Sequence, residues 1–156
     1  MNPPLQQLTT VLELAARRRD EALQALVQAQ QEHEQALAQM NQIKGYTAES
    51  LQRWSLRASQ GITPSLLRTH QTFMAKLEHA VSFQDGVLTR LSQNIQHRKG
   101  QLLDAERELA SLQKVQQRRI EDWQKIRQRQ EQRSTDEMAA NQHRRHAQAH
   151  PWRSQP

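Results

Sequence analysis

The segment Ala58–Pro64, which reads Ala-Ser-Gln-Gly-Ile-Thr-Pro, interrupts two very long stretches of helix-forming sequence. Gly61 can adopt the positive φ that ends a helix, Thr63 is a residue type that caps a helix N-terminus, and Pro64 suits the first helical position. Because a helix stop is followed so soon by a helix start, the second helix must fold back along the first. The segment therefore predicts a helical hairpin whose turn lies at about 58–63. Gly61, Thr63 and Pro64 are the predicted turn residues.

The composition favours a long coiled coil over a globular domain. Apolar residues make up 35% of the 156 residues, against about 45–50% in an average domain. Gln, Ala, Leu, Arg and Glu dominate, and all of them favour helices. The chain has no cysteine, which excludes disulfides and thiolate sites. No apolar run approaches the roughly 20 residues that span a bilayer, and no secretory signal is visible, so we expect a cytoplasmic protein.

Apolar residues recur at alternating steps of three and four through the first stretch, which we expect to be helical over about 4–57. This spacing over some five heptads is typical of a coiled-coil seam. One of its two columns is alanine, which lets a partner helix approach to an axial distance near ~8 Å. The predicted seam comprises Leu8, Leu12, Ala15, Arg19, Ala22, Leu26, Ala29, His33, Ala36, Met40 and Ile43.

The second stretch, expected to be helical over about 64–138, shows the same spacing in two blocks. The first block is Phe73, Leu77, Ala80, Gln84, Val87 and Leu91. The second is Leu88, Leu91, Ile95, Arg98, Leu102, Ala105, Leu109, Leu112, Gln116, Arg119, Trp123 and Ile126. The blocks overlap at Val87 and Leu88 with a slip of one residue, which should relax the supercoil locally.

The two seams predict a single register for the hairpin. In an antiparallel pair of helices, facing residues share one midpoint along the chain. Leu26 with Ile95, and Ile43 with Leu77, both have their midpoint near residue 60, inside the predicted turn. The predicted fold is therefore all-α, a long antiparallel two-helix coiled coil over residues 1–140. Residues 141–156 lose the periodicity, contain Pro151 and are expected to form a disordered tail.

This register leaves the end of the second helix without a partner for about 20 residues. The overhang continues the apolar stripe and adds basic side chains. Residues 1–60 carry six Lys or Arg and six Asp or Glu, whereas residues 61–156 carry sixteen and ten. We interpret the overhang as a docking surface, and the alternative is a solvated, frayed helix end. The predicted docking residues are Arg118, Arg119, Trp123, Lys125, Ile126 and Arg127.

The sequence shows no catalytic or cofactor-binding constellation. Its four glycines are isolated, so no phosphate-binding loop is present. His33 is expected to act as a polar register-setting residue on the seam. The spacing of His143, His146 and His150 could bind a metal ion weakly, but we interpret it as adventitious. Acidic residues interleave with the basic ones, which disfavours nucleic-acid binding. We expect no enzyme activity, no small-molecule substrate, no cofactor and no membrane insertion.

The turn and its flanks resemble the FliJ family of the bacterial flagellar type III export apparatus. The resemblance rests on Gln60–Thr63 (Gln-Gly-Ile-Thr), on Gln71–Ala80 (Gln-Thr-Phe-Met-Ala-Lys-Leu-Glu-His-Ala), and on Gln39, Ile43 and Tyr46. It covers most of residues 5–140. It implies a stalk similar to the central coiled coil of rotary ATPases, at the cytoplasmic face of the inner membrane. The terminal end would sit in the hexameric ring of the export ATPase FliI, and the turn-side half would reach the export gate protein FlhA. The resemblance also implies that the chain escorts or recycles export chaperones.

The resemblance further implies which residues bind the gate: Gln39, Ile43, Tyr46, Phe73, Leu77 and Ala80. Ser50 replaces an aromatic residue of the family pattern, and Gln84 replaces a histidine. The last three gate residues and Ile43 also lie on the predicted seam, so an alternative is that they only hold the hairpin together. Gln39 and Tyr46 lie off the seam and are the better surface candidates.

Three other functions remain as alternatives. One is the equivalent stalk of a virulence-type III secretion system, which shares the architecture. Another is a structural coiled coil that self-associates through the uncovered stripe, whereas a stalk is expected to be a free monomer. The third is a basic nucleic-acid-binding helix, whose affinity would fall steeply with salt.

Overall fold

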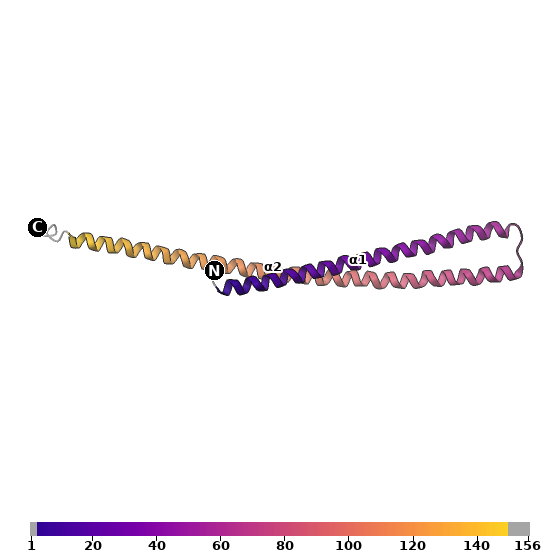
Figure 1. The fold of residues 1–156 in the computed structure, drawn as a ribbon, viewed down its shortest axis with the longest axis horizontal. Helices are drawn as coiled ribbons and strands as arrows, with labels where there is room; N and C mark the ends of the chain where they lie inside the picture. Colours follow the sequence, from indigo (N-terminus) through magenta and orange to yellow (C-terminus); the bar gives the residue numbers. More distant parts are fainter. Residues whose placement is uncertain (1–2, 150–156) are drawn as a thin grey trace. The chain divides into compact units, whose positions relative to one another are not determined.

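The computed structural model describes residues 3–149 and consists of two antiparallel helices that pack against each other (Figure 1). Helix α1 spans Pro3–Ala58 with 56 residues, and helix α2 spans Pro64–Ala149 with 86 residues. The predicted all-α hairpin is confirmed. The chain divides into two compact units. We call residues 14–108 the turn unit, and residues 3–13 with 109–149 the terminal unit.

Residues 59–63 connect the helices of the turn unit. Gly61 has a φ of 96°, and its N–H donates to the carbonyl oxygen of Ala58 at 3.2 Å. Thr63 caps α2, because its Oγ1 accepts a hydrogen bond from the N–H of Leu66 at 3.2 Å. Pro64 follows as the first residue of α2, where its missing N–H has no cost. The turn therefore supplies hydrogen-bond partners at the end of α1 and at the start of α2.

Substituting alanine for glycine should have opposite effects at Gly61 and at Gly100. A Cβ added at either position meets no atom within 4 Å, so only backbone conformation matters. Gly61→Ala is expected to lower the free energy of unfolding by about 1 kcal/mol, because alanine disfavours positive φ. Gly100→Ala lies inside α2 and should raise it by about 0.5–1 kcal/mol. Urea unfolding followed by circular dichroism measures both, and a loss of stability at both positions would contradict this account of the turn.

The seam of the turn unit follows the predicted positions. Every predicted seam residue of α1 from Ala15 to Ile43 is buried or half-buried, and Met40 is only 2% exposed. On α2, Val87 and Leu88 are both half-buried, as expected for two blocks that overlap with a slip of one residue. The side chain of Gln84 bonds to the carbonyl of Ala36 across the seam. The midpoint of that pair is residue 60, in agreement with the predicted register.

Aromatic contacts join the two helices at the turn end of the seam. The rings of Tyr46 and Phe73 meet edge to face, with centroids 6.0 Å apart and planes at 82°. Nearer the turn, the rings of Trp54 and His70 stack with centroids 3.8 Å apart and planes at 4°. Such ring pairs contribute about 0.5–1.5 kcal/mol each beyond their buried area. They replace the short aliphatic seam residues that hold the helices together farther from the turn.

The terminal unit has a short packed part followed by an uncovered helix. Leu8 of α1 and Leu109 of α2 are buried, at 7% and 6% exposure. Ile120 is half-buried, and every described residue of α2 after it is exposed. The uncovered segment of α2 is therefore 121–149. Over the described residues, neither helix contains a stretch long and apolar enough to cross a membrane.

Two details of the predicted second helix need correction. Arg119 was expected on the seam, but it is exposed and Ile120 is half-buried in its place. The seam takes a four-residue step from Gln116 because isoleucine gains more from burial than arginine does. Helix α2 also continues to Ala149 instead of ending near Met138. Residues 139–149 contain no glycine or proline and consist largely of Ala, Gln, Arg and His, so nothing stops the helix there. The rest of the predicted tail, 150–156, lies outside the described residues.

Candidate protein-docking surfaces

The turn unit brings together the six residues that the resemblance assigns to gate binding. We call this set the turn-unit surface: Gln39, Ile43, Tyr46, Phe73, Leu77 and Ala80. Gln39 is exposed and Tyr46 is 51% exposed, whereas the other four are half-buried. Because the half-buried residues also pack the seam, their substitution would change both stability and any binding. Gln39 and Tyr46 are the residues through which binding can be tested separately.

A buried glutamine lies beneath this surface. Gln84 is 7% exposed, and its Nε2 donates to the carbonyl oxygen of Ala36 at 2.8 Å. The same Nε2 donates to Oε1 of Gln39 at 3.3 Å. The seam pattern predicted the position of Gln84 but not these bonds, because periodicity carries no information on side-chain partners. Gln84 thus connects the interior of the hairpin to an exposed residue of the turn-unit surface.

Phe83 is an exposed aromatic residue that the sequence reasoning missed. It is 65% exposed, directly before Gln84 in α2. The available signal was its place between Ala80 and Gln84, which puts a large apolar side chain just off the seam. Aromatic residues are enriched in protein interfaces, so Phe83 is a further candidate for a protein contact.

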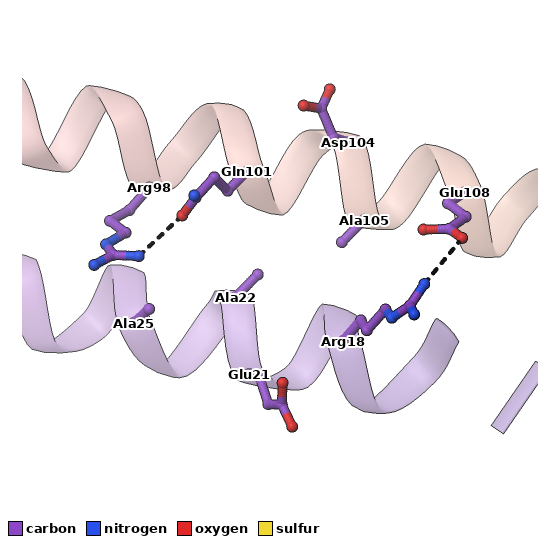
Figure 2. Close-up of a pocket in the computed structure, with 9 residues that line it drawn as sticks. All are labelled: Arg18, Glu21, Ala22, Ala25, Arg98, Gln101, Asp104, Ala105 and Glu108. Carbon is purple, nitrogen blue, oxygen red and sulfur yellow. Dashed lines mark hydrogen bonds and ion pairs between the residues drawn. The ribbon is translucent and has the colours of Figure 1, made fainter. Parts of the chain in front are cut away.

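A hollow lies between α1 and α2 along the turn unit (Figure 2). It measures about 550 Å³ and forms where Ala22, Ala25 and Ala105 leave space between α1 and α2. Arg18 pairs with Glu108 at 3.5 Å on its rim, at 56% and 51% side-chain exposure, so this ion pair adds little stability. Glu21 and Asp104 point away from the hollow in Figure 2. The hollow is lined in part by small alanine side chains and carries no group of a catalytic or metal site.

The terminal unit carries the second predicted surface, which we call the terminal surface: Arg118, Arg119, Trp123, Lys125, Ile126 and Arg127. All six are exposed, with Trp123 at 42% and Ile126 at 53%. The guanidinium of Arg127 lies 5.5 Å from the ring centroid of Trp123, and its Nε pairs with Oε1 of Glu131 at 3.2 Å. Arg127 therefore supports the helix locally, while Trp123 and Ile126 present apolar area to solvent.

Both surfaces offer groups for protein contacts. Within residues 3–149, no group of three or more His, Cys, Asp or Glu side chains is placed to hold a metal ion. His143 and His146 lie on the uncovered helix, and His150 lies outside the described residues. Exposed aromatic and aliphatic side chains edged by arginine and glutamine are the composition of a protein–protein interface.

Comparison with known proteins agrees with this architecture. The profile of the family described as "Flagellar FliJ protein" matches residues 5–148. A solved structure of a YscO homolog from Chlamydia trachomatis superposes with a TM-score of 0.68 at 18% sequence identity, over 94% of this chain and 95% of that chain. This likeness shows that the two share a fold. The comparison with curated proteins found no match. The family match covers nearly the whole chain, so the protein belongs to the FliJ family and is a protein of the type III export apparatus.

Proposed function

We propose that the chain is a non-enzymatic stalk that docks in the ring of the export ATPase FliI and engages the export gate FlhA. Its terminal surface enters the ring and favours one ring state over others by binding that state more tightly. Its turn-unit surface binds the gate. It acts at the cytoplasmic face of the inner membrane at the flagellar base and also escorts export chaperones.

The observation that carries the proposal is the uncovered segment of α2. Residues 121–149 form a helix whose side chains are all exposed, and it begins with the apolar pair Trp123 and Ile126. Isolated helices are marginally stable in water, because most helical stability comes from packing an apolar face. A helix of this length with an exposed apolar pair is therefore suited to a binding site that covers that pair.

The turn unit supports the gate contact in a different way. Tyr46 of α1 and Phe83 of α2 expose aromatic rings, and Gln39 of α1 is also exposed. Aromatic residues are enriched at the centres of protein interfaces, where they contribute most of the binding energy.

Purification of the tagged protein from its own host tests the proposal. The lysate is kept at about 0.3 M salt, which weakens loose electrostatic binding, and bound proteins are identified by mass spectrometry. We expect the flagellar export ATPase and the gate protein among them. Recovery of virulence-system homologues instead would assign the chain to that system. Recovery of the chain alone, with a molecular mass by light scattering that rises with concentration, would support self-association and contradict the stalk.

A further inference from the structure

Gln84 makes an unusual connection between the seam and the exposed residue Gln39. Its side chain is 7% exposed, yet its neighbours on the seam, Ala80 and Val87, are apolar. Burying a carboxamide is costly unless its polar atoms are paired. Here Nε2 of Gln84 donates one hydrogen bond to the carbonyl oxygen of Ala36 at 2.8 Å and another to Oε1 of Gln39 at 3.3 Å.

This network fixes the orientation of both carboxamides. A backbone carbonyl can only accept, so the atom of Gln84 that lies 2.8 Å from it must be the Nε2 donor. The atom of Gln39 that faces the same Nε2 must then be its acceptor, Oε1. Since Oε1 is held toward the seam, the Nε2 donors of exposed Gln39 are left for solvent or for a partner.

We propose that Gln84 is a positioning residue, which holds Gln39 so that the turn-unit surface presents hydrogen-bond donors to an acceptor oxygen of the partner protein. The proposal rests on the gate contact described above and adds one hydrogen bond to it, donated by Gln39. The partner group is a carbonyl or a carboxylate, since only an acceptor can pair with the outward Nε2 of Gln39.

A role in packing alone would not require glutamine at this position. Methionine has nearly the same shape and could fill the seam without a polar atom. Its substitution leaves no buried group without a partner, because the carbonyl of Ala36 lies inside α1 and Gln39 is exposed to water. Gln84 also lies just before the half-buried pair Val87 and Leu88, where the two seam blocks overlap. A single polar residue on a seam can specify register at some cost in stability, and the bond to Ala36 is suited to do so here.

The test compares Gln84→Met, Gln39→Ala and the double variant with wild type in the full chain. Gln116→Met, at a half-buried seam position of the terminal unit, is the matched control. Thermal unfolding measures stability, and NMR of the side-chain amides of Gln39 and Gln84 measures their order and hydrogen exchange. Titration with purified FlhA measures affinity.

We expect Gln84→Met to keep or raise the melting temperature, to release the Gln39 amide into fast motion, and to weaken FlhA binding about three- to tenfold. The double variant should bind no more weakly than Gln39→Ala, because both changes remove one contact. Gln116→Met should leave affinity and the Gln39 amide unchanged.

A Gln39 amide that is as ordered in Gln84→Met as in wild type would overturn the positioning role. Additive losses of affinity in the double variant would do the same. If wild type does not bind FlhA, the proposed gate contact is contradicted. The proposed acceptor group on the partner is then contradicted as well. The NMR measurement on the free protein would then still decide whether Gln84 holds Gln39.

Discussion

Replacing Trp123 and Ile126 together by alanine is expected to weaken binding to the export ATPase ring by about 100-fold. The two side chains are 42% and 53% exposed in the free chain, so a ring that covers them gains their remaining apolar area. Truncating a central aromatic residue of an interface typically costs about 2–4 kcal/mol, which corresponds to this loss of affinity. The measurement is a titration of the purified ring with labelled stalk.

Stability of the free protein should change little in this double variant. Both residues lie in the segment of α2 after Ile120, where every described side chain is exposed. Gln128→Ala with Gln132→Ala is the matched control, because helical periodicity places these residues on the opposite face of the same segment. Equal affinities for the two double variants would show that the ring does not bind through Trp123 and Ile126. A large fall in the melting temperature of the Trp123 and Ile126 variant alone would show that these side chains pack within the free chain.

Local side-chain contacts help the uncovered segment of α2 to stay helical in the free protein. Gln117 donates to Glu121 at 3.2 Å, and Arg127 pairs with Glu131 at 3.2 Å, each four residues along the helix. Pairs of this kind stabilise a helix by about 0.2–0.5 kcal/mol each, and less at high salt. They are enough to favour helix but far too weak to replace a packed seam. Contacts with a partner would therefore supply the packing from which most helical stability comes.

The sequence predicted the hairpin because heptad spacing and turn chemistry are both local signals. The alanine column, the overlap at Val87 and Leu88, and the residues of the turn were all visible in one dimension. Where alternatives of similar spacing competed, the prediction was wrong. Arg119 lies three residues and Ile120 four residues after Gln116, so both fit the spacing of the seam. Ile120 takes the seam position because burying isoleucine is more favourable than burying arginine.

Other features could not be read from spacing at all. The end of α2 was placed near Met138 because the apolar periodicity stops, but a helix needs only the absence of breakers and good helix formers to continue. The bonds of Gln84 depend on a carbonyl and a side chain of the facing helix, at sequence separations of 48 and 45. The roles of both docking surfaces likewise depend on partners and stay predictions.

Tyr46→Ala is expected to weaken FlhA binding by about 30-fold while leaving the hairpin folded. Tyr46 is 51% exposed, so its removal should reduce the binding free energy more than the stability of the hairpin. Its contact with Phe73, with ring centroids 6.0 Å apart, contributes about 0.5–1.5 kcal/mol to stability. The melting temperature should therefore fall by only a few degrees. Titration with purified FlhA and thermal unfolding of the same samples measure the two effects separately.

Two further variants make this result specific to the surface. Leu51→Ala removes a side chain of similar exposure, 47%, that lies outside the turn-unit surface, and it should leave affinity unchanged. Leu77→Ala removes a half-buried seam residue and should lower the free energy of unfolding by about 1–3 kcal/mol. If Tyr46→Ala and Leu51→Ala bound FlhA equally well, the exposed tyrosine would not belong to the gate contact. If only Leu77→Ala weakened binding, in proportion to its loss of stability, the turn-unit surface would be nothing more than the edge of the seam.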